Sequence, residues 1–154
     1  SSNQIMFNME NIQVVSQLIQ GQFPDYEKLI PNSSTTQTLV DRSKLLQSIK
    51  AASIFARDGS GIIKFVMDKN SKKLSILSNA EEMGDLENDI DADVNGDDSK
   101  VAFNSKFLQD VVGVLDTPQI KIDTSSPSSP GVFTEKSNGN SNYRHVIMPM
   151  FVQW

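Results

Sequence analysis

The chain has 154 residues, a formal net charge of −5 at pH 7, 38% hydrophobic residues and no cysteine. This length suffices for one domain of ordinary size and a fragment of another, and no apolar run approaches the ~18 residues that a membrane span needs. The lack of thiols excludes disulfides and thiolate metal sites, and the negative charge opposes indiscriminate binding to nucleic acid.

The first 31 residues predict a hairpin and a junction. Alternating apolar residues at Ile5, Phe7 and Met9 predict a strand, and residues 12–19 predict a second strand after a turn. Because a lone hairpin is marginal in water, we expect residues 1–22 to be the terminal hairpin and linker of a preceding, truncated domain. Two prolines then enclose a short amphipathic run in residues 22–31, and we expect residues 23–154 to form a domain of their own.

Two segments predict helices. Residues 41–57 carry an apolar stripe with Asp41 as N-cap, and every charged residue between Asp41 and Asp58 is basic. Ile54 and Phe55 point away from the stripe, which is consistent with ordinary surface exposure or with contact to a partner subunit. A second helix is predicted from the cap Asn104 to about Leu115, with an apolar stripe formed by Phe107, Leu108, Val111, Val114 and Leu115.

The helices belong to an internal repeat. The run Ser-Lys-Leu-Leu-Gln from Ser43 is matched 62 residues later by Ser-Lys-Phe-Leu-Gln from Ser105. Predicted strands surround both runs in the same order, so residues 35–94 and 98–150 read as two copies of a strand–helix–strand–strand–strand unit. The strands that follow the helices are predicted at 62–67, 73–77, 82–94, 117–123, 132–134 and 142–150. The sequence therefore predicts an α+β fold with pseudo-twofold symmetry and two helices packed on an antiparallel sheet.

The acidic residues and the single histidine give little support to catalysis. Residues 91–96 imitate the start of a calcium loop, but its twelfth position is Ala102 where a bidentate Glu is needed. On a strand, Glu87, Asp89, Asp91 and Asp93 share one face, which suits a solvated face or a charged edge. His145 lies in an apolar strand, where a structural role is commoner than general base chemistry. We therefore expect no metal, no cofactor and no catalytic residue; a metal-binding enzyme that uses the Asp-rich segment remains an alternative.

Two motifs resemble those of the bacterial sliding clamp family, the beta subunit of DNA polymerase III. One is Phe-Pro-Asp-Tyr from Phe23, followed by a basic residue, an aliphatic pair and Pro31; the other is Val146-x-Met-Pro-Met. The resemblance implies a DNA-clamp fold, with residues 1–22 ending the second domain and 23–154 forming the third. It also implies a non-catalytic processivity factor that is cytoplasmic and associated with the nucleoid. The full-length protein would be a head-to-tail homodimeric ring around duplex DNA. DNA polymerase III alpha and clamp-loader subunits would be its peptide partners; an interaction module without a DNA role is the other alternative.

The resemblance also implies three sets of site residues. The peptide-binding groove would be formed by Pro24, Lys28, Leu29, Asn104, Phe107, Ser129, Gly131, Val146, Ile147, Met148, Pro149 and Met150. DNA-facing residues would be Arg42, Lys44, Lys50, Arg57 and Lys106, although a solvated helix face is the plainer interpretation. The subunit interface would use Ile54, Phe55, Glu82 and Glu87. Residues 151–154 extend beyond the usual end of the family, and an exposed Phe and Trp there would alter the groove.

Overall fold

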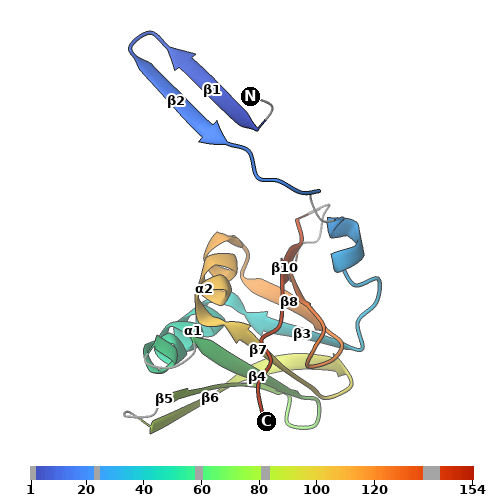
Figure 1. Ribbon diagram of the computed structural model, residues 1–154. Coiled ribbons are helices and arrows are strands. Elements are labelled where there is room, and N and C mark those ends of the chain that lie inside the picture. Colours follow the sequence, from blue (N-terminus) through green and yellow to red (C-terminus); the bar gives the residue numbers. More distant parts are fainter. Residues whose placement is uncertain (1–2, 23–24, 58–60, 81–83, 137–142) are drawn as a thin grey trace.

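The computed structural model describes residues 3–22, 25–57, 61–80, 84–136 and 143–154. Its first elements are the antiparallel strands β1 (Gln4–Met9) and β2 (Ile12–Gln17), which confirm the predicted hairpin. Every residue of both strands is exposed, and Figure 1 shows the hairpin projecting away from the rest of the chain. A 3-10 helix, η1 (Tyr26–Leu29), follows; the proline-bounded run gave no indication of its type.

The remaining elements form two copies of one unit, as the repeat predicts. The first copy is β3 (Thr36–Asp41), α1 (Arg42–Arg57), β4 (Ile62–Asp68), β5 (Lys73–Ala80) and β6 (Gly84–Gly96). The second copy is β7 (Ser99–Asn104), α2 (Ser105–Val114), β8 (Gln119–Thr124), β9 (Gly131–Glu135) and β10 (His145–Ile147).

The two copies interlock within one antiparallel sheet, whose strand order is β10-β9-β8-β3-β6-β5-β4-β7. The first strand of each copy pairs with the second strand of the other copy. Thus β3 pairs with β8, with Thr38 opposite Ile122, and β7 pairs with β4, with Val101 opposite Phe65. This reciprocal exchange gives the pseudo-twofold arrangement and confirms the predicted α+β fold (Figure 1).

The core lies between the helices and the sheet. The predicted α1 stripe is buried at Leu45, Ile49, Ala52 and Ala56. The ring of Phe103 on β7 makes edge-on contacts with those of Phe65 and Phe133, with centroids 5.7 Å apart in both pairs. Burial of these apolar side chains is the main favourable contribution to folding. Neither helix in the described part of the chain is long and apolar enough to cross a membrane.

The buried face of α2 differs from the predicted stripe. Phe107 and Val114 are 54% and 68% exposed, whereas Val112 is fully buried. Leu108, Val111, Val112 and Leu115 fall on one side of a helix with 3.6 residues per turn, and Phe107 and Val114 lie at the margins of that side. Phe107 is therefore available on the surface.

The last strand is shorter than predicted, because β10 ends at Ile147. Pro149 has no N–H group to donate to a strand partner, and the next N–H group, that of Met150, binds the carbonyl oxygen of Ala102 on β7 at 2.7 Å. The chain thus leaves β9, the partner of β10, and turns toward a different strand.

Candidate functional site

Several residues of the predicted groove meet around the end of β7. Asn104 ends this strand and caps α2, because its Oδ1 atom accepts a hydrogen bond from the backbone N–H of Lys106 at 2.9 Å. Gly131 begins β9 and lies opposite Ile147 on β10. A Cβ atom on Gly131 would come within 2.4 Å of Cζ of Phe103, so the backbone of β9 lies directly against β7's aromatic residue. With Met150 bonded to Ala102, β7, α2, β9 and the segment after β10 meet where the two ends of the sheet approach each other.

Apolar side chains of the predicted groove on α2, the tail and η1 are left in solvent. Phe107 is 54% exposed and Met148 56% exposed, while Leu29 on η1 is 46% exposed. Val146, Pro149 and Met150 are partly buried. Ile147, in contrast, is 3% exposed and belongs to the core, so the tail contributes both to the core and to the surface.

Two further groove residues are held by local contacts, and one cannot be placed. Lys28 forms an ion pair with Asp25 at 3.2 Å and remains largely exposed. The hydroxyl of Ser129 lies 2.7 Å from that of Ser126 in the loop before β9. Pro24 lies outside the described residues.

The predicted DNA-facing residues divide into two groups. The side chains of Lys50, Arg57 and Lys106 are exposed on the helices, and none of them forms an ion pair with another described residue. Lys44 lies 3.4 Å from Asp91 and is directed toward β6. Arg42 is engaged at the other helix: its Nε and Nη2 atoms donate to the carbonyl oxygens of Val112 and Gly113 at 3.0 and 3.1 Å. These carbonyls, near the end of α2, attract a cation because the helix leaves them without partners.

The described residues of the predicted subunit interface lie on α1 and on strand β6. Ile54 is 54% exposed and Phe55 is half-buried. Strand β6 pairs with β5 over residues 84–91 and with β3 over residues 92–96. Within the described part of the chain, residues 84–91 have no strand on their other side, and Glu87 is exposed there. The acidic strand is therefore paired on one side over each part, with β5 along its first part and with β3 beyond it; Glu82 lies outside the described residues.

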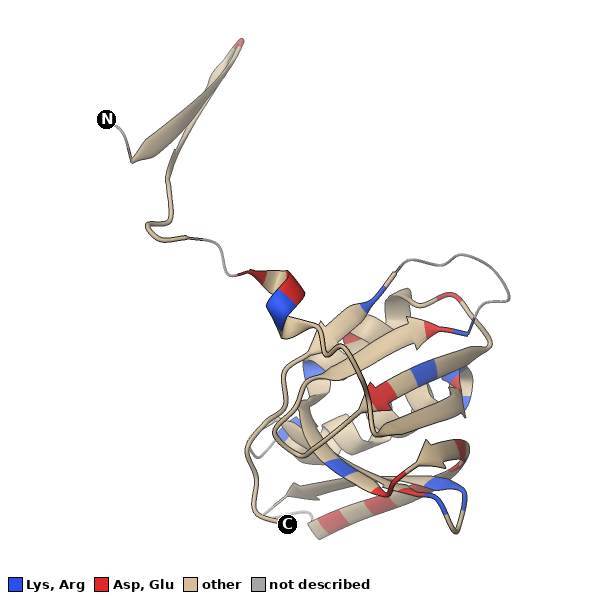
Figure 2. Ribbon diagram, turned by 90° about the vertical axis from the view of Figure 1, so that its right-hand side faces the viewer, with Lys and Arg blue, Asp and Glu red and all other residues tan. Residues whose placement is uncertain are grey.

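The acidic residues of β6 engage lysines and hydroxyls. Asp89 accepts a hydrogen bond from the hydroxyl of Ser75 and pairs with Lys73 at 3.2 Å. The Ser75 hydrogen bond, and after it the Lys73 ammonium group, hold the pKa of Asp89 below its ordinary value. Figure 2 shows acidic positions repeated along the strand at the bottom of the domain. Among the described residues, no three Asp, Glu or His side chains gather as a metal ion would require.

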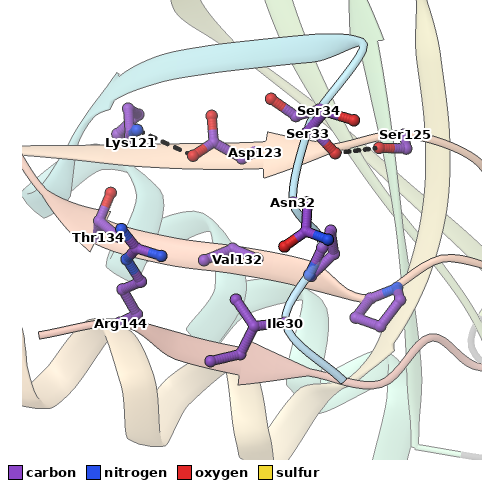
Figure 3. A pocket seen from close by; sticks show the side chains of 12 residues that line it. Ile30, Asn32, Ser33, Ser34, Lys121, Asp123, Ser125, Val132, Thr134 and Arg144 are labelled. Carbon is purple, nitrogen blue, oxygen red and sulfur yellow. Dashed lines mark hydrogen bonds and ion pairs between the residues drawn. The ribbon is translucent and has the colours of Figure 1, made fainter. Parts of the chain in front are cut away.

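Sequence reasoning did not foresee a cavity of about 200 Å³ on the sheet face away from the helices. Residues 30–34 cross over it, and Lys121 and Asp123, 2.9 Å apart, lie at one side (Figure 3). Ile30, Val132 and Arg144 also contribute to its lining. The cavity shares no residue with the predicted groove. It is formed in part by the connection of residues 30–34, whose path is not indicated by any local sequence pattern.

The geometry defines a duplicated α+β domain with an exposed apolar surface at the end of β7. Residues 27–151 match the family described as the DNA polymerase III beta subunit, C-terminal domain. This match spans most of the chain, and the chain therefore belongs to that family.

Similar proteins agree with this assignment. The chain is 29% identical over 152 residues to a beta sliding clamp of Staphylococcus aureus, covering 97% of this chain and 39% of that protein. A solved DNA polymerase III beta chain of Streptococcus pneumoniae is 26% identical, with a TM-score of 0.79, over 99% of this chain and 40% of that one. The beta subunit of Thermotoga maritima, at 24% identity, has a TM-score of 0.81 over 98% of this chain and 40% of that one, which shows the likeness of fold. The chain thus spans about two fifths of the length of these relatives.

Proposed function

We propose that this chain is the C-terminal part of a processivity factor for DNA replication. In this proposal the full-length protein is a head-to-tail homodimeric ring around duplex DNA, without catalysis of its own, in the cytoplasm at the nucleoid. It tethers DNA polymerase III alpha and clamp-loader subunits through short peptides. Family membership and the names of the relatives support this role.

The proposed domain division assigns residues 1–22 to a second domain and residues 23–154 to the third. The hairpin supports it, because Phe7, Ile12 and Val15 are between 52% and 59% exposed on strands that have only each other as partners among the described elements. Apolar strands of this kind need further strands or a helix to cover them. The remainder of a preceding domain would supply that cover.

The observation that carries the peptide-binding proposal is the exposure of Phe107 and Met148 beside the end of β7. Exposed apolar residues that gather in one place mark interaction sites, and methionine adapts its shape to different partners. Leu29, from the junction, would add an apolar contact from a third element. The groove would be completed by the second domain, so this chain alone should bind weakly.

The proposal is tested by NMR shift mapping with a Gln-Leu-x-Leu-Phe peptide. We expect shifts at Leu29, Phe107 and Val146–Met150, and a weakening of at least about fivefold on Phe107→Ala, since exposed aromatic anchors dominate such interfaces. Val114→Ala is the matched control, because Val114 is also apolar and 68% exposed on α2. Shifts confined to other surfaces at millimolar peptide would contradict the assignment.

The DNA-binding part of the proposal rests on Lys50, Arg57 and Lys106. Their exposed charges on neighbouring helices would attract phosphates without reading sequence, as a sliding contact requires. In a full-length clamp carrying this domain, Lys50→Glu with Arg57→Glu should lower retention on DNA and reduce its salt dependence. Lys69→Glu with Lys72→Glu, both in the exposed turn after β4, is the control of equal charge change. Unchanged retention on DNA in the Lys50→Glu, Arg57→Glu variant would contradict the DNA-facing role and favour the alternative, an interaction module without a DNA role.

The ring interface would use Ile54 and Phe55 together with the open part of β6. An apolar contact beside an unpaired strand edge can join subunits by extending the sheet. Ile54→Asp in the full-length protein should shift the dimer toward monomer in analytical ultracentrifugation. Val114→Asp, another exposed apolar position on a helix, should leave the dimer intact.

A further inference from the structure

The segment after β10 connects the two ends of the sheet. In the strand order, β10 is at one end and β7 at the other, and the tail crosses from the first to the second (Figure 1). The N–H of Met150 reaches the carbonyl of Ala102 on β7 at 2.7 Å. Ala102 alternates with the core residues Val101 and Phe103, so it faces away from the helices, yet it is 0% exposed. The crossing chain explains this burial.

Beyond Met150, the tail is attached to the outer face of β4 and β7. The ring of Trp154 lies 5.4 Å from Nζ of Lys64 and 5.9 Å from Nζ of Lys100. Lys64 also donates to the carbonyl oxygen of Gln153 at 2.8 Å. Each contact is weak at an exposed site, but all three hold one short segment. Phe151, at 85% exposure, is left in solvent.

We propose that residues 151–154 are a strap that positions the groove wall formed by Met148, Pro149 and Met150. Trp154, held by Lys64 and Lys100, is the positioning residue. This inference rests on the proposed peptide-binding function. Residues 148–150 have no ladder partner in the described sheet, so they would lose conformational freedom on binding a peptide. A strap that orders them in advance removes that cost and raises affinity.

The direction of the tail distinguishes a strap from an occluding segment. Lys64 on β4 lies opposite Ala102 on β7, and Lys100 on β7 lies opposite Val66 on β4. Both lysines that hold Trp154 are therefore on the sheet. Phe107, in contrast, is on α2. Because Trp154 is held on the sheet's outer face, it orders the groove wall without covering Phe107, and releasing it should weaken peptide binding. If the tail instead occluded the groove, releasing Trp154 would give tighter peptide binding.

The experiment compares Trp154→Ala with Phe151→Ala in this 154-residue chain. Without peptide, hydrogen exchange at the Met150 amide should accelerate at least about fivefold in Trp154→Ala and stay unchanged in Phe151→Ala, since the amide opens with the local segment. Binding of the Gln-Leu-x-Leu-Phe peptide should weaken about threefold to tenfold in Trp154→Ala only. Lys64→Met with Lys100→Met should reproduce both effects while leaving the indole in place.

The results separate the strap from the groove itself. Unchanged exchange and affinity in Trp154→Ala, or tighter peptide binding, would overturn the strap. If the unaltered chain fails to bind the peptide, the proposed groove fails, while accelerated Met150 exchange in Trp154→Ala still establishes the anchoring. Circular dichroism of each variant checks that the domain remains folded.

Discussion

The guanidinium group of Arg42 donates a hydrogen bond from Nε to the carbonyl oxygen of Val112 at 3.0 Å and so joins the start of α1 to the end of α2. This contact places a cation at the negative end of a helix and links the two copies of the repeat. Replacing Arg42 by Met should lower the free energy of unfolding by about 1–2 kcal/mol, because charged hydrogen bonds to partly buried carbonyls are lost. Urea unfolding at neutral pH measures this.

Lys106→Met is the control for Arg42→Met. The Lys106 ammonium group is exposed and forms no ion pair with a described residue, so its loss should change stability by less than about 0.5 kcal/mol. Equal effects of the two substitutions would show that the Arg42 contact contributes nothing specific.

Gly131 has no space for a side chain. Its Cβ position lies 2.4 Å from Cζ of Phe103, whose ring is fixed between Phe65 and Phe133. Gly131→Ala should therefore destabilise the domain by about 1–3 kcal/mol through overpacking. Gly113→Ala in α2 meets no atom within 4 Å and should stabilise by up to about 1 kcal/mol, because alanine favours helix. In thermal and urea unfolding, the free energy of unfolding should fall for Gly131→Ala and rise for Gly113→Ala.

Phe107 and Leu108 separate surface from core on one helix. Leu108 is 0% exposed and Phe107 54% exposed. Leu108→Ala should lower the unfolding free energy by about 2–5 kcal/mol, whereas Phe107→Ala should cost less than about 1 kcal/mol. A large loss on Phe107→Ala in urea unfolding would mean that Phe107 is a core residue, as its place in the predicted stripe implied.

Asp89 should make stability depend on pH. Its pKa is lowered, first by the Ser75 hydrogen bond and then by Lys73, so the folded chain releases this proton more readily than the unfolded chain. The resulting stabilisation is present above the ordinary aspartate pKa of about 4 and is lost as pH falls through the lower folded value. Asp89→Asn should therefore destabilise at pH 7 and have a smaller effect near pH 2–3. Urea titrations at both pH values, with Asp93→Asn from the same strand as control, measure this difference.

Much of the fold follows from local pattern because the repeat is written in adjacent residues. The match between the runs at Ser43 and Ser105, with strands around each, predicts the order of elements and the two-layer arrangement. The caps and the α1 stripe are likewise local, since Asn104 needs only the N–H two residues on.

The departures come from contacts between distant residues. The end of β10 depends on Ala102 and Met150, which are far apart in sequence, and the unforeseen contact of Arg42 with Val112 depends on the position of α2. Periodicity also misplaced Phe107, because a marginal position on a helix is buried only where another element covers it. The predicted roles of the groove, DNA-facing and interface residues remain predictions.

The two copies of the repeat differ at one seam. In the first copy β3 and β6 form a ladder from Thr36 to Val40, whereas in the second copy β7 and the tail share the single bond between Ala102 and Met150. The second copy therefore lacks the ladder between first and last strands that closes the first copy. Residues 148–150 are therefore free of the pairing constraints that fix strand sequences. Their side chains can serve a binding surface, while the fold is preserved by the rest of the domain.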